Sequence, residues 1–396
     1  MQICPDKILR IPRSGIREIF DLVPTIPDVV NLCVGEPDFT TPSFIIEQAF
    51  EAARKGATHY TSNAGILELR EEIAKKYKKE QGISYAPDKE VVITVGAMEA
   101  LFLALTSIIS EGQEVLLPDP FWPNYEAQII LAGGKPVFIP TKEEEGWVLT
   151  PDRMRRYLSP RSKAIILNSP SNPTGCVYGP EELEKIARVA KSHSLVVISD
   201  ECYEKIIYEG EHKSIASLKD MRSGTIIINS FSKAYAMTGW RVGYALGDED
   251  IIKQMTKLQE DVAACASSIS QEAALAAMRS GDGATEEMFR QYRLRRSLLL
   301  EEIEKTPMIS CSSPKGTFYA FINIKKLNQK SRDIALKWLR EAKVATVPGS
   351  AFGREGEGYL RISFATGEDK IREAFERIRS LMKRSREVVF EKGGDN

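Results

Sequence analysis

A lysine and an arginine stand eight residues apart in a segment that is rich in small hydroxyl residues. Lys233 closes the stretch Ser230-Phe231-Ser232-Lys233, and Arg241 lies in Gly239-Trp240-Arg241-Val242-Gly243. A lysine amine can condense with an aldehyde, and a guanidinium can hold a phosphate group through paired hydrogen bonds. The two side chains together indicate a site for pyridoxal 5′-phosphate, a cofactor that carries both of these groups.

Strand-like and helical stretches alternate through the middle of the chain, which indicates an α/β fold. Lys233 follows one apolar run, Thr225–Ile228, and helical patterns such as Met98–Ser110 and Glu181–Lys191 separate similar runs. The other strand candidates are Val91–Val95, Glu114–Leu117, Pro136–Ile139, Ala164–Leu167, Leu195–Ser199 and Val242–Leu246. Continuous β-branched strands that are separated by helices are typical of a mostly parallel sheet covered on both faces.

The pattern changes after about residue 284, which predicts a smaller α+β domain. A charged helix is expected from Thr285 to about Lys305. The strand candidates that follow are Thr317–Ile324, Val344–Val347 and Leu360–Phe364. The helix candidates are Ser331–Lys343 and a terminal helix from Glu368 onward. Near the N-terminus, Gly15–Leu22 is helix-like and Val29–Val34 is strand-like. We expect an N-terminal arm that belongs to the small domain over residues 1–44, a large domain over 45–284 and a small C-terminal domain over 285–396.

The composition argues against several classes of protein. The chain has 396 residues and a net charge of −1, so it has no general attraction for nucleic acid. No apolar run approaches the roughly 18–20 residues that cross a membrane. The six cysteines form no Cys-x-x-Cys pair and do not cluster with the three histidines, so no metal site is expected. The N-terminus has no apolar leader, and we expect a cytoplasmic protein with reduced thiols.

Further polar residues stand where a strand gives way to a turn. Asp200 directly follows the strand candidate Leu195–Ser199, at the end where open α/β sheets place ligand-contacting groups. Gly96-Ala97-Met98 joins a strand to a helix, where backbone N–H groups and the helix dipole favour a phosphate. Arg361 is flanked by apolar residues. A buried arginine needs an anionic partner, which is either a substrate carboxylate or a structural ion pair.

Five motifs in one order resemble those of the class I/II, fold-type I aminotransferases, and together they span nearly the whole chain. They are GEPDF at 35–39, NSPSNPTG at 168–175, DECY at 200–203, SFSKAYAMTGWRVGY at 230–244 and YLRI at 359–362. The resemblance implies an α/β fold whose large domain has a mostly parallel seven-stranded sheet between helices, with a smaller α+β domain beside it.

The resemblance also implies how the site residues act on pyridoxal phosphate. Lys233 would bind the cofactor covalently and then move protons, and Asp200 would pair with the ring nitrogen. Tyr203 would contact the phenolic oxygen. Asn172 would do the same and would orient the substrate carboxylate, with a cis bond to Pro173. Trp122 would stack on the ring.

A second group of residues would hold the two anionic ends. The phosphate cradle that the resemblance implies consists of Gly96, Ala97, Met98, Ser230, Ser232 and Arg241. Tyr60 would reach the same phosphate from a neighbouring subunit, which implies a homodimer with shared active sites. Gly35 and Arg361 would hold the α-carboxylate of the substrate, with Trp122 and Asn172 beside it.

These roles imply an aminotransferase that moves an amino group from an L-amino acid to a 2-oxo acid, such as 2-oxoglutarate, by a ping-pong mechanism. Some aspartate-specific relatives carry a basic side chain just after the phosphate-binding turn, where this chain has Met98. The sequence pattern does not identify another arginine as a partner for a distal carboxylate. This argues against aspartate as the dedicated substrate and leaves aromatic, alanine-like or broad specificity open, with aspartate as one possible substrate among these.

Two alternatives share part of this pattern. A carbon–sulfur lyase, or a related enzyme that eliminates from the β- or γ-carbon, uses the same cofactor residues. A regulator that only senses the cofactor would need a DNA-binding module, and the chain has no room for one before residue 35. A nicotinamide dehydrogenase would need a Gly-x-Gly-x-x-Gly turn, which we do not find.

Overall fold

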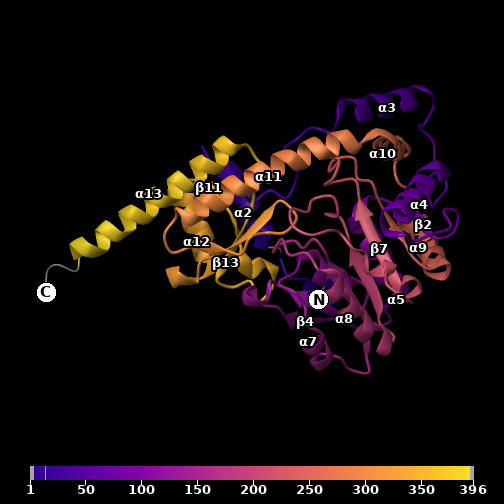
Figure 1. Ribbon diagram of the computed structural model, residues 1–396, viewed down its shortest axis with the longest axis horizontal. Helices are drawn as coiled ribbons and strands as arrows, with labels where there is room; N and C mark the ends of the chain where they lie inside the picture. The colour runs from indigo at the N-terminus through magenta and orange to yellow at the C-terminus, as the bar shows by residue number, and fades with distance from the viewer. Residues whose placement is uncertain (1–3, 14, 393–396) are drawn as a thin grey trace.

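A seven-stranded sheet lies at the centre of the computed structural model, which describes residues 4–13 and 15–392 (Figure 1). The strands lie in the order β2-β8-β7-β6-β5-β3-β4, and β8 is antiparallel to both of its neighbours while the other pairs are parallel. They are β2 (Val91–Thr94), β3 (Glu114–Asp119), β4 (Lys135–Pro140), β5 (Ser162–Asn168), β6 (Val196–Asp200), β7 (Thr225–Ser230) and β8 (Gly243–Leu246). The mostly parallel sheet that the apolar runs predict is confirmed.

Helices cover both faces of this sheet, as the apolar strands require. The α-helices of the described residues are α1 (Asp6–Leu9), α2 (Gly15–Leu22), α3 (Ser43–Arg54), α4 (Leu67–Gln81), α5 (Gly96–Ile108), α6 (Asn124–Leu131), α7 (Pro151–Arg156), α8 (Pro180–Ser192), α9 (Glu249–Val262), α10 (Ser268–Ser280), α11 (Asp282–Glu304), α12 (Ser331–Lys337) and α13 (Glu368–Lys392). Ile226 and Ile228 pack with the apolar faces of α5, α6 and α9, whereas Ile227 packs with α3, α4 and α10. Successive strand residues face opposite sides, so a strand buried on both faces must be apolar throughout.

A second group of short strands lies in the C-terminal part of the chain and pairs there with a strand from the N-terminal segment. β9 (Ser310–Cys311), β10 (Tyr319–Asn323), β12 (Val347–Pro348) and β13 (Tyr359–Ser363) form a four-stranded antiparallel sheet. β1 (Val30–Asn31) pairs in parallel with β11 (Val344–Ala345), which places the N-terminal segment against the C-terminal part. Figure 1 shows α11, α12 and α13 around these strands. The domain boundaries at 44/45 and 284/285 stay a prediction.

Two predicted elements of the C-terminal part are divided differently in the structure. The run Val344–Val347 forms two short strands, because β11 pairs with β1 whereas β12 pairs with β13. The range Ser331–Lys343, which was expected to be one helix, consists of α12 followed by a single π-helical turn, Trp338–Ala342. Lys343 then takes a left-handed backbone with φ of 59°, which stops the helix.

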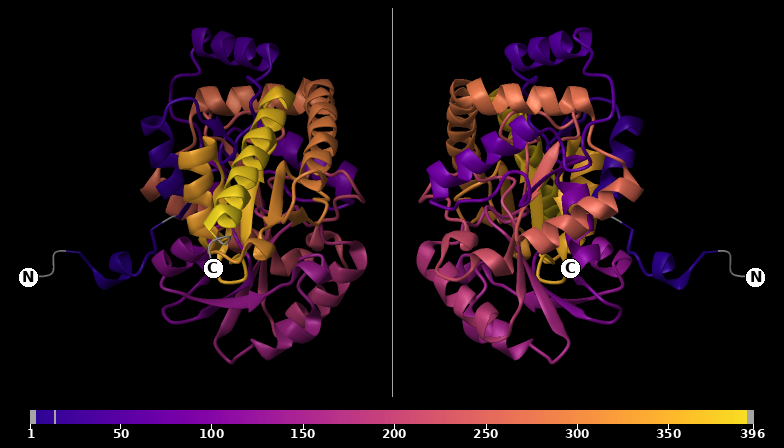
Figure 2. Two further views of the ribbon diagram at one scale, coloured as in Figure 1. Left: turned by 90° about the vertical axis from the view of Figure 1, so that its left-hand side faces the viewer. Right: turned by 90° about the vertical axis from the view of Figure 1, so that its right-hand side faces the viewer.

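Two segments reach outward from the body of the protein. α13 extends beyond the other elements in Figure 1, and Figure 2 shows the segment that carries α1 standing away from the rest. Within the described residues, no helix is both long enough and apolar enough to cross a membrane.

Candidate active site

A cavity of about 530 Å³ lies at the carboxyl ends of the central strands and collects most of the predicted site residues. β6 ends at Asp200 and β7 ends at Ser230, so both deliver a polar residue to the same edge of the sheet. The predicted residues that line the cavity are Gly35, Ala97, Met98, Trp122, Asn172, Asp200, Tyr203, Ser230, Ser232, Lys233, Arg241 and Arg361. Residues from the N-terminal arm, the large sheet and the C-terminal strands therefore meet in one place.

Lys233 places its amine inside this cavity. The Nζ atom donates a hydrogen bond of 2.6 Å to the backbone oxygen of Gly35 and lies 6.0 Å from the centre of the Tyr203 ring. A Cβ atom at Gly35 would lie 2.6 Å from the Tyr319 hydroxyl, so glycine permits this segment to pack closely against Tyr319. The amine is thus held at a defined point on the cavity wall.

Asp200 is a buried carboxylate at the inner end of the cavity. It accepts hydrogen bonds from the Tyr125 hydroxyl at 2.7 Å and from the Cys202 amide at 3.1 Å. Burial raises the pKa of Asp200, and these two hydrogen bonds act in the opposite direction. Among the side chains that the structure describes, no cation lies within 4.0 Å of this carboxylate. A cationic ligand atom would therefore be favoured beside it.

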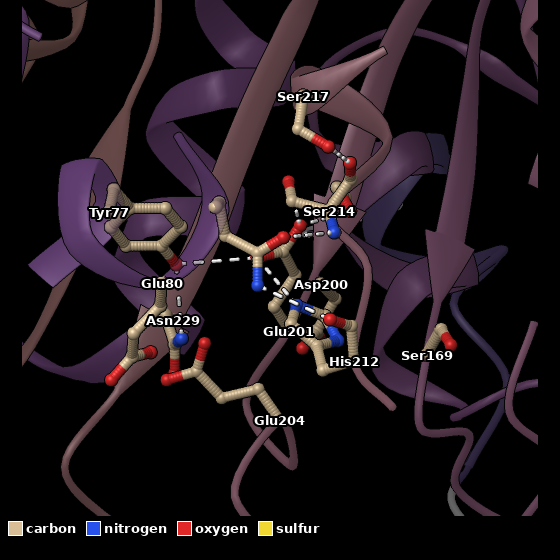
Figure 3. A network of polar contacts seen from close by, with 12 residues as sticks. Tyr77, Glu80, Ser169, Asp200, Glu201, Glu204, His212, Ser214, Ser217 and Asn229 are labelled. Carbon is tan, nitrogen blue, oxygen red and sulfur yellow. Dashed lines mark hydrogen bonds and ion pairs between the residues drawn. The ribbon is translucent and has the colours of Figure 1, made fainter. Parts of the chain in front are cut away.

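The next residue, Glu201, anchors the same strand end from the other side (Figure 3). Its carboxylate accepts hydrogen bonds from Ser199 at 2.9 Å and from Ser214 at 2.7 Å, and it pairs with His212 Nε2 at 3.1 Å. Tyr77 donates to the same carboxylate at 3.3 Å. These contacts fix the backbone at the end of β6, and so they fix the position of Asp200.

Glu201, Glu204 and His212 also bring three potential metal ligands within 4.8 Å of one another. The ammonium of Lys76 is paired with Glu204, however, and serine hydroxyls already donate to Glu201. We interpret this group as a charge-balanced structural network.

Arg361 is the buried cation of the site. It lies on β13 with only 2% of its surface exposed. Nη1 donates to Asn172 Oδ1 at 3.0 Å and Nη2 donates to the Cys33 backbone oxygen at 2.8 Å, while Nε has no hydrogen-bond partner. No carboxylate among the described side chains lies within 4.0 Å, so the alternative of a structural ion pair does not hold. The guanidinium is suited to an anion that comes from outside the chain.

Backbone and side-chain donors converge on the opposite part of the cavity. Gly96 begins α5 with φ of 74°, and a Cβ atom there would lie 2.6 Å from Arg241 Nη2. A Cβ atom at Gly243 would lie 2.6 Å from the amide nitrogen of Ala97. The two glycines therefore let a guanidinium and a helix N-terminus come together, with Ser230 and Ser232 beside them on the cavity wall.

This donor set fits pyridoxal phosphate. The cofactor needs an amine for its aldehyde, a carboxylate for its ring nitrogen and donors for its phosphate. The cavity offers Lys233, Asp200 and the Gly96–Arg241 cradle for these purposes. The buried carboxylate, which has no cation beside it among the described side chains, and the close approach of Arg241 to Gly96 are both features that such a ligand would use.

Three further predicted residues lie in this arrangement. The Tyr203 hydroxyl is 2.9 Å from the Tyr319 hydroxyl, and Trp122 packs edge-on against Tyr125 with 5.4 Å between the ring centres. The bond from Asn172 to Pro173 is cis, as the resemblance implies.

Tyr60 and Gly96 are the predicted residues that do not line the cavity of the same chain. Gly96 lies against the Arg241 guanidinium, since a Cβ atom at Gly96 would be 2.6 Å from Arg241 Nη2. Tyr60 is 88% exposed on the surface, so any contact with a phosphate would have to be made in another subunit.

Sequence reasoning missed several residues that line the cavity. Tyr125 follows Trp122 by three residues, a helical spacing that could have placed both on one side. Asn168 and Cys202 lie inside the motifs at 168–175 and 200–203, which could have indicated them, whereas Tyr319 had no comparable signal because its position depends on strand packing. Arg17 and Phe20 reach the cavity from α2, which no local pattern connects with the sheet.

The chain belongs to the aminotransferase class I and II family, whose model matches residues 27–378. It is 42% identical to an aromatic-amino-acid aminotransferase 2 of Thermococcus litoralis, covering 97% of this chain and 99% of that protein. It is 44% identical to an aspartate aminotransferase of Pyrococcus abyssi, covering 96% and 98%. A solved aspartate aminotransferase of Thermus thermophilus with maleate superposes with a TM-score of 0.92 at 37% identity, covering 96% of this chain and all of that one.

The protein is therefore a pyridoxal phosphate-dependent aminotransferase of fold type I. It transfers an amino group from an amino acid to a 2-oxo acid. These relatives favour amino transfer over the alternative of a carbon–sulfur lyase.

The network behind Asp200 predicts a pH-dependent stability. Burial alone would lower the pKa of His212, but the Glu201 carboxylate outweighs burial and raises it above 6.5. A raised histidine pKa stabilises the folded state below the unfolded pKa, and this contribution is lost as the pH rises through the folded value. The free energy of unfolding of the wild type, relative to His212→Gln, should thus be largest below about pH 6.5 and should fall above it.

Urea unfolding at several pH values measures this difference. His193→Gln, which changes an exposed histidine outside the Glu201 network, is the matched control. A wild-type advantage over His212→Gln that grows with rising pH would contradict the assignment.

Proposed function

We propose that the cavity performs amino transfer with Lys233, Asp200 and Arg361 as its three principal groups. The observation that carries this proposal is their meeting in one cavity, with the amine, the buried carboxylate and the buried guanidinium each without an opposite charge within 4.0 Å among the described side chains. Pyridoxal phosphate, when bound, supplies an aldehyde for the amino group and a ring that accepts the electron pair released at Cα.

Arg361 would bind the α-carboxylate of the amino acid and fix its orientation. Two of its nitrogen atoms are held by Asn172 and Cys33, so the guanidinium is oriented before the substrate arrives. The Asn172 amide stands beside it and would contact the same carboxylate. A pre-oriented donor stabilises charge without the cost of ordering it during the reaction.

Lys233 would move the proton. Its Nζ atom would move a proton from the substrate Cα to C4′ of the bound cofactor, and it would move one from C4′ to Cα in the second half of the cycle, when the 2-oxo acid receives the amine. The contact of 2.6 Å with the Gly35 backbone oxygen gives this amine a resting position beside the substrate anchor.

Asp200 would keep a positive charge at the ring nitrogen. Its burial makes an unpaired carboxylate costly, and a cation beside it would remove that cost. The Tyr125 and Cys202 donors would hold the carboxylate in position for that partner. Tyr203 would contact the phenolic oxygen, and Trp122 would stack on the ring.

We propose broad donor specificity with a dicarboxylic 2-oxo acid, such as 2-oxoglutarate, as the acceptor. One relative is named for aromatic amino acids and another for aspartate, and the solved Thermus enzyme holds maleate, a dicarboxylate. The cavity wall includes both apolar residues, among them Ile16 and Phe20, and cationic residues, which supports both kinds of substrate.

We also propose a cytoplasmic homodimer whose subunits consist of an arm with a large and a small domain, as the sequence predicts. Two features support the dimer. Tyr60 is an exposed tyrosine in a polar turn, and the segment with α1 stands away from the body (Figure 2). Both would be covered by a second copy whose phosphate cradle Tyr60 completes.

Lys233→Ala tests the proposed anchor. Loss of the amine should lower transamination by at least about 1,000-fold, since proton transfer by a positioned side chain contributes about that much. Borohydride reduction and peptide mass mapping should locate the cofactor on Lys233 in the wild type and on no lysine in the variant. Lys253→Ala, at an exposed lysine of α9, is the control and should keep both properties. Cofactor found on another lysine would contradict the proposal.

Subunit mixing tests the shared site. Lys233→Ala and Tyr60→Ala proteins are each expected to be impaired, because one lacks the amine and the other a phosphate contact. Random hybrid dimers would contain one intact site in half of the dimers, so activity should return to about a quarter of the wild-type value.

The control for this mixing is Lys233→Ala with Asp200→Ala, since both changes lie in the cavity of the chain that carries them. That mixture should stay inactive. Restoration in the control, or a fully active monomer in analytical ultracentrifugation, would exclude a site that Tyr60 completes.

A further inference from the structure

Three arginines line the active-site cavity, and only two of them have a role so far. Arg361 faces the expected substrate carboxylate, and Arg241 belongs to the phosphate cradle. The third, Arg17, lies on α2 and comes from the N-terminal arm. Its guanidinium is a charge in the cavity wall that the proposed reaction has not yet used.

The packing of α2 explains why Arg17 faces the cavity. Ile19 on this helix is fully buried, and a Cβ atom at Gly15 would lie 2.8 Å from Ala351 Cβ. Glu18 accepts a hydrogen bond of 3.1 Å from Arg332 Nε. These contacts dock one side of the helix on the C-terminal part, and they leave Arg17 and Phe20 on the side that lines the cavity.

Arg17 has no anionic partner among the side chains that the structure describes, because no carboxylate lies within 4.0 Å of its guanidinium. Its Cζ atom lies 5.6 Å from the centre of the Phe20 ring, so an aromatic face supports it. Glu36, which also lines the cavity, accepts a hydrogen bond of 3.0 Å from Thr238. Glu36 and Asp200, the acidic residues of the cavity wall, both accept hydrogen bonds from residues other than Arg17.

We propose that Arg17 binds the distal carboxylate of dicarboxylic substrates, both the 2-oxo acid acceptor and the matching amino acid. This inference rests on the proposed function, in which Arg361 holds the α-carboxylate of the same molecule. A substrate with two carboxylates would then span two guanidinium groups on one cavity, each free to form charge-assisted hydrogen bonds.

The assignment also accounts for Met98. Met98 lines the cavity next to the phosphate cradle and receives a contact of 3.2 Å from the Asn124 amide, so it offers no positive charge there. Arg17 supplies a cation from the N-terminal arm instead. An aromatic substrate would not need this charge and could pack on the Phe20 ring that lies beside it.

Arg17→Gln in the holoenzyme tests the proposal, with Arg17→Lys as the conservative variant. Arg13→Gln is the matched control, because Arg13 belongs to the same arm but lines a neighbouring cavity. Calorimetry should compare the binding of glutarate with that of valerate, which replaces one carboxylate by a methyl group. Half-reaction kinetics should compare glutamate with the monocarboxylic amino acid that the wild type converts fastest.

We expect Arg17→Gln to weaken glutarate binding and to lower kcat/KM for glutamate by about 10- to 100-fold, as loss of a charge-assisted hydrogen bond does. The affinity for valerate, and kcat/KM for the monocarboxylic amino acid, should change less than about threefold. Arg17→Lys should recover part of the loss, and Arg13→Gln should behave as the wild type does.

Two results would overturn the role of Arg17. One is an equal loss for dicarboxylic and monocarboxylic ligands, which would mean that Arg17 only positions α2. The other is a wild type that does not distinguish glutarate from valerate. In both cases transamination of any amino acid by the wild type would leave the proposed function standing, whereas absence of all transamination would refute that function itself.

Discussion

A buried arginine without a carboxylate is the constraint around which the site is organised. Moving a guanidinium out of water costs several kcal/mol unless an anion compensates it. Within the described residues, Arg361 receives an amide oxygen from Asn172, a backbone oxygen from Cys33 and the faces of the Tyr319 and Phe352 rings, and no carboxylate. The charge is thus left for the substrate, and three distant parts of the chain must be folded together to hold Arg361 in readiness.

A similar need for charge compensation arises for the buried carboxylates at the end of β6. Asp200 and Glu201 are neighbours that lie in different polar surroundings. Glu201 is compensated within the protein by His212 and by serine hydroxyls, and it fixes the strand end. Among the residues that the structure describes, the donors to Asp200 are neutral, which leaves its charge for a cation of the cofactor. One strand end therefore serves both stability and chemistry.

The sequence predicted most of the central sheet because its strands are buried on both faces and need an unbroken apolar run, as Thr225–Ile228 shows. Lys233, Asp200 and Arg241 were predictable because each follows such a strand or lies in a motif of the family. The positions of Tyr319 and Arg17 were not predictable from local pattern, because β10 and α2 reach the cavity only through tertiary packing. The split of Val344–Val347 into two strands likewise depends on partners far away in the chain.

The most direct measurement of the central claim is the joint effect of Arg361→Met on activity and on stability. We predict that kcat/KM for transamination falls by about 100- to 10,000-fold, as expected when two charge-assisted hydrogen bonds to a carboxylate are lost. The free energy of unfolding should stay the same or rise, because an apolar side chain removes an uncompensated buried charge. A variant that loses several kcal/mol of stability yet keeps near-normal kcat/KM would contradict the account, since Arg361 would then serve the fold and not the substrate.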